Sequence, residues 1–178
     1  FFLALGIFVM ITQQFYGPLL KERLDKFFIF DDTSSLDRKV IWHAAFKMFL
    51  SKPWLGLGLG TFMFNFNKFM AGSYSSGLIP YAHNCYLQMG VEIGIIGLLS
   101  FLLVIILFFY NGIKIINTRE RTFSWYILLA SLASVLGYCV QMAVDTNLYS
   151  LDLGILFWML LGLGVASMNN IKLESSLQ

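Results

Sequence analysis

The sequence predicts an all-α integral membrane protein, a multispan helical bundle with a large external loop, on three observations. Hydrophobic residues make up 58% of the chain and charged residues only 12%, against about a quarter in a typical soluble protein. The mean hydropathy is +0.73. The apolar residues gather in long runs, and the chain has room for roughly three or four spans of about 20 residues.

The first apolar run, residues 1–11, predicts the end of a membrane span over residues 1–16. The span finishes before Gly17 and Pro18, because proline does not continue a helix. This run has no basic flank and no small-residue cleavage site, so it does not resemble a signal peptide. The chain begins inside the run with a phenylalanine, and we therefore expect it to be a fragment of a longer protein.

Residues 17–88 predict an external loop that contains an amphipathic helix. Charges cluster before Ser35, and Ser34 followed by Asp37 predicts a helix start. The helix continues to about Ser51, is too short and too charged to span, and is expected to lie along the membrane surface. Its three stripes are Leu36, Val40, Ile41, Ala44 and Met48; Lys39, His43 and Lys47; and Arg38, Trp42, Ala45 and Phe49.

Glycines at positions 56, 58 and 60 alternate with leucines after Pro53. A dinucleotide-binding fingerprint needs its third glycine at another position and a strand before the motif, and neither is present. We interpret the segment as a tight backbone turn packed against the membrane surface. Residues 62–80, which are aromatic and rich in Gly and Ser, predict a mobile flap over a site.

Residues 89–168 predict three membrane spans, followed by a polar tail over residues 169–178. The loop at residues 111–122 holds three basic residues and the loop at residues 145–152 holds none. The positive-inside rule therefore puts the first loop in the cytoplasm and the second outside. Counting the crossings puts the amino-terminal loop outside the membrane and the tail in the cytoplasm.

Composition and spacing also exclude several classes of site. The net charge of +2 is too small to suggest a nucleic-acid partner. The two cysteines, Cys85 and Cys139, do not make a disulfide framework, and we interpret both as packing residues. Neither they nor the two histidines have the spacing of metal ligands, so we expect no metal and no other cofactor.

Three polar side chains stand where the second apolar run begins. His83 is either a general base, because histidine titrates near neutral pH, or a structural hydrogen-bonding residue. Asn84 beside it is suited to orient a polar ligand. Glu92, just inside the span, is either a functional ionisable group or a structural residue that caps a helix or stays hydrated.

Arg38 is the candidate for binding an anionic headgroup. A guanidinium binds phosphate in a bidentate and permanently charged manner, which suits a lipid-linked substrate at the outer membrane face. The alternative is that Arg38 snorkels to headgroup phosphates. Trp42, one helical turn later on the same stripe, is included as a supporting residue.

Three motifs in this order resemble the carboxy-terminal half of the bacterial O-antigen ligase and O-antigen polymerase family. They are Asp37-Arg38 through Trp42 to Met48, Lys52-Pro53 through the glycines to Phe62, and His83-Asn84 through Gln88 with Glu92, Gly94 and Gly97. A weaker fourth match runs from Asp145 through Trp158 to Gly162. The resemblance covers about residues 35–164.

The resemblance implies a GT-C-like glycosyltransferase of the bacterial inner membrane, with its active loop on the periplasmic side. It implies transfer of a glycan from an undecaprenyl-diphosphate carrier to a hydroxyl of lipid A core, another glycan or a protein, without a metal. By the resemblance, Arg38 binds the donor diphosphate and His83 activates or positions the acceptor hydroxyl. The family's other important arginine is expected in an earlier external loop that this chain lacks.

Two other classes remain open. One is a transporter or flippase segment for a lipid-linked or anionic substrate, with Arg38 and Glu92 along its path, although the spans hold few ionisable residues. The other is a non-catalytic membrane scaffold, in which His83 is replaceable. Within the enzyme class, a surface polysaccharide ligase or polymerase is favoured over protein glycosylation, and the sequence does not choose between the first two.

Overall fold

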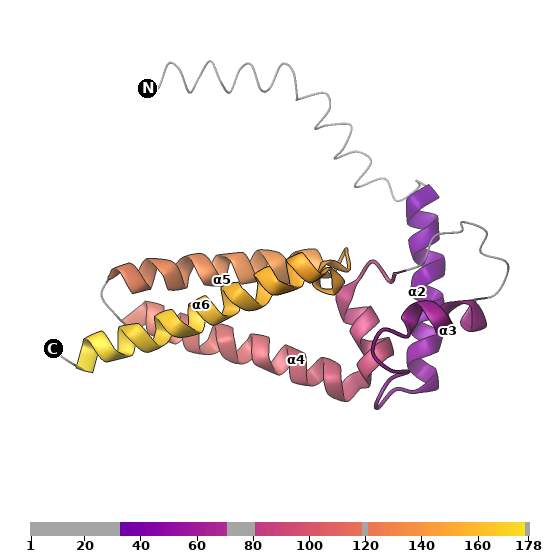
Figure 1. The fold of residues 1–178 in the computed structure, drawn as a ribbon, viewed down its shortest axis with the longest axis horizontal. Helices are drawn as coiled ribbons and strands as arrows, with labels where there is room; N and C mark the ends of the chain where they lie inside the picture. Colours follow the sequence, from indigo (N-terminus) through magenta and orange to yellow (C-terminus); the bar gives the residue numbers. More distant parts are fainter. Residues whose placement is uncertain (1–32, 71–80, 119–120, 177–178) are drawn as a thin grey trace, which may run out of the picture. The chain divides into compact units, whose positions relative to one another are not determined.

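The computed structural model describes residues 33–70, 81–118 and 121–176, and these residues form helices and connecting loops without a strand. The elements are α2 (Thr33–Ser51), α3 (Phe62–Phe69), α4 (Cys85–Thr118), α5 (Phe123–Met142), the short 3-10 helix η1 (Asn147–Tyr149) and α6 (Leu151–Ser176) (Figure 1). The predicted all-α fold is confirmed. The chain divides into two units, Phe1–Val40 and Ile41–Gln178, each described by itself.

Helices α4, α5 and α6 are long and apolar enough to cross a membrane. Their bounds differ from the predicted ones at several places. Helix α4 begins at Cys85, before the expected start at residue 89, and it continues to Thr118 through most of the expected loop at residues 111–122. Helix α6 continues through Ser176. Most of the expected polar tail is therefore helical. The expected span end at residues 1–16 and residues 71–80 of the expected flap lie outside the described residues. Residues 62–69 of that flap form α3, whose Phe62 and Phe66 are buried, so this part is a packed helix.

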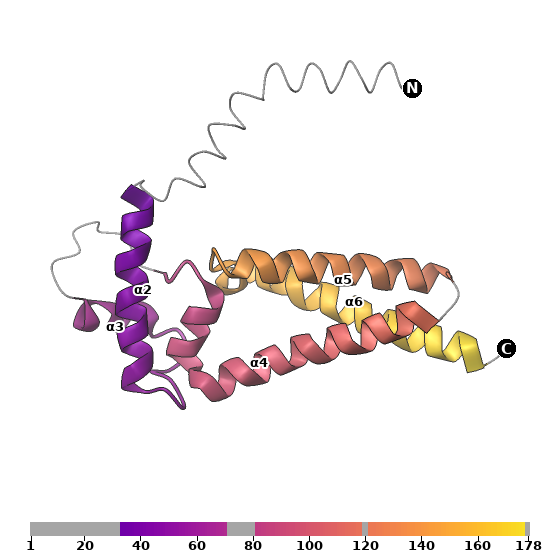
Figure 2. The same ribbon diagram turned by 180° about the vertical axis from the view of Figure 1, so that it is seen from behind.

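The three long helices contact one another, and α5 and α6 run side by side in both views (Figure 2). Small residues permit the close approach: a Cβ added to Gly164 would lie 2.7 Å from the Phe108 ring, and one added to Gly112 would lie 2.8 Å from Leu132. Helix pairs in lipid depend on such packing, because lipid tails are as apolar as the side chains.

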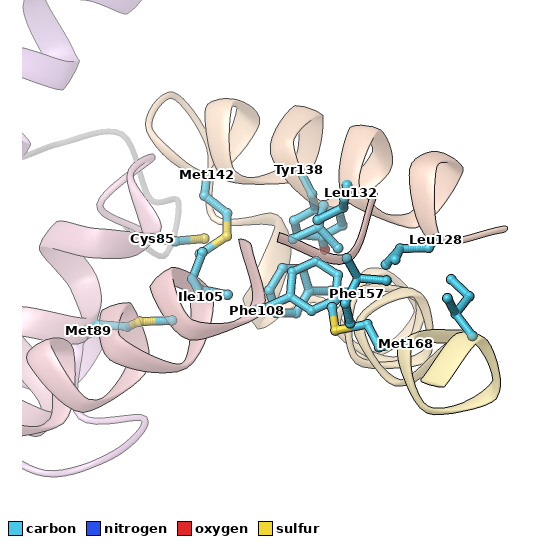
Figure 3. Close-up of a cluster of buried hydrophobic side chains, with 13 residues drawn as sticks. Cys85, Met89, Ile105, Phe108, Leu128, Leu132, Tyr138, Met142, Phe157 and Met168 are labelled. Atoms are coloured by element: carbon cyan, nitrogen blue, oxygen red, sulfur yellow. The ribbon is translucent and has the colours of Figure 1, made fainter. Parts of the chain in front are cut away.

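One cluster of buried side chains joins α4, α5 and α6 (Figure 3). At its centre Tyr138 of α5 and Phe157 of α6 have ring centroids 5.0 Å apart. The Tyr138 hydroxyl also donates to the Leu153 carbonyl at 2.7 Å, and the Tyr86 hydroxyl donates to the Cys139 carbonyl at 2.9 Å. These bonds satisfy phenol groups within an apolar bundle, where an unpaired one would be costly.

Helix α4 is broken at Gly94, whose φ of 69° lies in the left-handed region. Residues 85–93 form a short segment before the break, and residues 95–118 form the long one. In both views the short segment turns away from the long one and leads back toward the connection between α5 and α6 (Figures 1 and 2). A break in a helix frees backbone N–H and C=O groups, which must find other partners.

The glycine-rich loop, defined here as residues 52–61, provides those partners. Four backbone hydrogen bonds join it to α4 on both sides of Gly94: Ile95 N to Pro53 O (2.8 Å), Ile96 N to Trp54 O (3.4 Å), Leu57 N to Val91 O (2.8 Å) and Gly58 N to Glu92 O (2.9 Å). Gly56, Gly58 and Gly60 all have positive φ. The predicted tight turn is present, and it packs against the break in α4.

Alanine at Gly56 or Gly94 is expected to separate the loop from α4. A Cβ on Gly56 would lie 2.4 Å from the Glu92 carbonyl carbon, and one on Gly94 would lie 2.3 Å from the Trp54 carbonyl oxygen. Losing several of the four bonds lowers the free energy of unfolding by about 2–4 kcal/mol. Thermal unfolding of the chain in detergent, compared with wild type, measures this loss.

Gly60 is the matched control for that measurement. Its φ is also positive, at +69°, but a Cβ there would meet no atom within 4 Å. Gly60→Ala therefore carries only the backbone strain of the left-handed region, about 1–2 kcal/mol. An equal loss of stability at all three glycines would contradict the close approach of the loop to α4.

The part of α2 after Ile41 packs against α3 and the short segment of α4. The buried face consists of Ile41, Ala44, Ala45 and Met48, and it meets Phe62, Phe66 and Val91. The buried face shares Ile41, Ala44 and Met48 with the predicted apolar stripe; Val40 of that stripe is 44% exposed, and Ala45, assigned to the Arg38 stripe, is fully buried. Small Ala45 lets the helix approach its neighbours closely.

Candidate functional site at the start of helix α4

His83 lies in the connection that leads into α4, and its φ is 47°. Among the described residues it is the only residue other than glycine with a positive φ. Histidine tolerates this region better than most residues, yet the conformation costs roughly 1 kcal/mol or more. Such strain persists only where the surrounding structure fixes the backbone, and it is enriched at functional sites.

The preceding residue, Ala82, is fixed by two side chains. Its carbonyl accepts a hydrogen bond from Trp42 Nε1 at 2.7 Å, and its N–H donates to Gln88 Oε1 at 3.2 Å. Ala82 is fully buried and Gln88 is 2% exposed, so the bond between them is shielded from water, whereas the bond from Trp42 is partly buried. Trp42, predicted as a supporting residue, therefore holds the backbone next to His83.

Asn84 and Cys85 tie the same turn to the loop between α5 and α6. Asn84 Oδ1 accepts from Leu87 N at 2.9 Å, which caps the start of α4, while its Nδ2 donates to the Ala143 carbonyl at 2.9 Å. Cys85 Sγ lies 3.3 Å from the Asp145 carbonyl oxygen. The structure thus assigns Asn84 a positioning contact, and Cys85 bonds to the loop in addition to packing.

Asp145 is brought to His83 by these contacts. The Asp145 Oδ1 atom lies 3.7 Å from His83 Nδ1, and the two side chains are 55% and 43% exposed. This separation is too long for a hydrogen bond but suits an ion pair once the imidazole is protonated. Sequence reasoning missed Asp145 as a site residue; its one signal was its position at the start of the weaker fourth motif.

Glu92 is 1% exposed, and its Oε1 atom accepts from Phe62 N at 3.3 Å, at the start of α3. Its Oε2 atom has no hydrogen-bond partner among the described residues. Burial raises the pKa of the Tyr149 phenol above its ordinary value, and the neighbouring Glu92 carboxylate raises it further. Glu92 therefore connects α3, α4 and η1 as a buried capping group, and a part in chemistry stays a prediction.

Arg38 lies on α2 in the first unit, and its side chain is exposed. Its binding of a diphosphate stays a prediction. Within the described residues, no three or more His, Cys, Asp and Glu side chains gather where they could hold a metal ion. The structure therefore brings together Trp42, His83, Asn84 and the unpredicted Asp145.

This arrangement is suited to accept one proton. The imidazole is half-exposed, its backbone is held on both sides, and a carboxylate faces Nδ1. When Nε2 accepts a proton, the carboxylate stabilises the resulting imidazolium and favours its orientation. The site lies at the start of a helix whose longer segment is apolar enough to enter a membrane.

Replacing Asp145 with alanine is expected to weaken any reaction that uses His83, without abolishing it. An exposed ion pair is worth up to about 1 kcal/mol, so the rate should fall by less than about tenfold. The loss should vanish in a His83→Ala background, because the carboxylate acts through the imidazole. Rates of the two single variants and the double variant check this; an additive loss would contradict the pairing.

The amino-terminal part of the chain matches a known protein family. A family model described as O-antigen ligase matches residues 1–102. The matched part includes Arg38, Trp42, His83 and Glu92, whereas Asp145 lies beyond it. Neither the curated proteins nor the solved structures contain a match to the chain.

Proposed function

Because the chain belongs to the O-antigen ligase family, we propose that it is a membrane glycosyltransferase that moves a glycan from an undecaprenyl-diphosphate carrier to an acceptor hydroxyl. The proposal places it in the bacterial inner membrane, with the site on the periplasmic side. The observation that carries the proposal is the held His83 beside Asp145, at the start of a helix that can span a membrane.

The donor already contains a good leaving group. As the bond from the sugar's anomeric carbon to the diphosphate oxygen breaks, the electron pair leaves with the diphosphate. The enzyme chiefly has to stabilise this growing negative charge and hold a hydroxyl in line. We assign the first task to Arg38, since a guanidinium binds phosphate oxygens in a bidentate and permanently charged manner.

The acceptor hydroxyl forms the new bond to the anomeric carbon and must lose its proton. We assign that proton to His83 Nε2, with Asp145 stabilising the imidazolium that forms. Trp42 and Asn84 act by holding the turn that carries His83. Glu92 supports the same region through its contact with α3.

The test is a transfer assay with the full-length protein in membranes. Wild type and His83→Ala are given an undecaprenyl-diphosphate glycan together with lipid A core, glycan or protein acceptors. Transfer that depends on His83 supports the proposal, and the acceptor that grows distinguishes a ligase, a polymerase and a protein glycosyltransferase. If no acceptor grows with wild type, the proposal fails.

The non-enzymatic alternatives have less support. A transporter reading needs Glu92 along a path, but its Oε1 atom is bound to the backbone of α3 and the side chain is buried. A scaffold reading gives no reason for a strained backbone at His83. Donor movement across the membrane without transfer to an acceptor would favour the transporter.

A further inference from the structure

The glycine-rich loop presents three large apolar side chains away from α4. Trp54, Leu55 and Leu59 are 69%, 76% and 79% exposed, although the loop backbone between them is bonded to α4. Single exposed apolar residues are ordinary on any protein, but three within six residues form a patch, and such patches mark interaction surfaces. The backbone of the loop thus bonds to α4, whereas these three side chains remain exposed.

The position of this patch indicates what it contacts. The loop is bonded to Ile95 and Ile96, the first residues of the long segment of α4. Ile96, Leu99 and Leu103 of that segment are themselves 52%, 56% and 55% exposed, as expected for a helix surface that faces lipid. The patch therefore lies next to exposed apolar residues at the end of the candidate span of α4.

The chemistry of the loop suits the boundary between headgroups and hydrocarbon. Tryptophan is enriched at that boundary, because it has a large apolar body and one polar N–H. Four backbone bonds to α4, together with Gly56 N to Lys52 O at 3.0 Å, satisfy much of the loop's polar backbone. A loop bonded in this way enters the boundary at a lower cost than an open one. Lys52, exposed at its start, suits headgroup phosphates.

We propose that residues 53–60 form a membrane anchor, with Trp54, Leu55 and Leu59 inserted into the boundary region of the bilayer leaflet at the start of the long segment of α4. The anchor fixes the depth of the break at Gly94. Through the short segment, about 14 Å long, it also fixes the depth of His83. The anchor does not depend on the transfer reaction, so either proposal can fail alone.

Spin labels measure the depth of the loop directly. Nitroxides are attached to Leu55→Cys and Leu59→Cys in the full chain, in vesicles of phosphatidylethanolamine and phosphatidylglycerol. Lys47→Cys is the matched control, as an exposed charged position on α2. The native cysteines can also take up some label, although Cys85 is buried and Cys139 half-buried. The signal of the labelled parent chain, which has only these two cysteines, is therefore subtracted. Collision rates with oxygen, which enters lipid, and with a polar nickel complex are compared.

The anchor predicts more collisions with oxygen than with nickel at positions 55 and 59, and the reverse at position 47. A preference for nickel at positions 55 and 59 would overturn the proposal, because the loop would then lie in water. Protection from both agents would also overturn it, because another part of a protein would then cover the patch. Equal thermal midpoints for the three variants show that the fold is kept.

A second measurement tests the depth of the site itself. A nitroxide at Tyr81→Cys, a position 40% exposed and two residues before His83, reports the depth of that turn. Adding Leu55→Asp and Leu59→Asp is expected to shift this label toward water, raising its nickel collisions at least about twofold. An unchanged label would remove the depth-fixing role from the anchor.

Discussion

Replacing His83 with alanine is expected to lower glycan transfer by about a hundredfold or more, because loss of a positioned general base typically costs 10²–10⁴-fold. The substitution also removes the partner of Asp145 at 3.7 Å. Alanine leaves the bonds of Ala82 and Asn84 in place, so the turn before α4 should persist. The measurement is the initial rate of transfer in membranes, normalised to the amount of inserted protein.

His43 is the matched control for this experiment. It is the other histidine of the chain, it lies exposed on α2, and His43→Ala is expected to transfer at close to the wild-type rate. Normal transfer by His83→Ala would remove His83 from the chemistry and return it to a structural role. Equal losses in both variants would point to a general effect on the region rather than to a proton acceptor.

Replacing Arg38 with alanine is expected to lower transfer to a similar extent, by about 10²–10³-fold, because one group that stabilises developing charge contributes that much. Arg38→Lys should keep part of the rate, since an ammonium preserves the charge but not the bidentate geometry. The assay uses the same membranes and donor. Binding of an undecaprenyl-diphosphate lipid without an acceptor measures the diphosphate contact separately.

The neighbouring Lys39 provides the control for Arg38. It is exposed on the same helix and carries the same charge. If Arg38 acts only by attraction to anionic headgroups, Lys39→Ala should lower the transfer rate as much as Arg38→Ala does. A rate that falls equally in both variants would favour headgroup contact over a diphosphate site. Unchanged transfer by Arg38→Ala would remove Arg38 from the donor site altogether.

The break in α4 explains how His83 comes to lie beside Asp145. An unbroken α4 would continue the direction of its span through residues 85–93. The break at Gly94 turns that segment back to the α5–α6 loop, where Asn84 and Cys85 are bonded. The glycine-rich loop satisfies backbone groups that the break frees. His83 thus meets a residue from a distant loop while the rest of α4 remains suited to a membrane.

Composition and periodicity were sufficient for the class of fold and for much of α2. Apolar runs of span length exclude a soluble chain, because they could not be covered by so few polar residues. Ile41, Ala44 and Met48 were grouped on one apolar stripe by helical spacing alone, and all three are buried. The motifs also indicated the family, which the family match confirms.

The sequence by itself therefore determined a helical membrane protein of the O-antigen ligase family, whereas the roles of Arg38 and His83 stay predictions. Only the tertiary structure decided that α4 breaks at Gly94, that Glu92 caps α3 and that Asp145 faces His83. The reason is physical, because residue spacing along one helix specifies only which residues share a face. The contacts of Glu92 and Asp145 join residues 30 and 62 positions apart. The break at Gly94 depends on carbonyl groups of a separate loop. Such contacts exist only once the chain has packed.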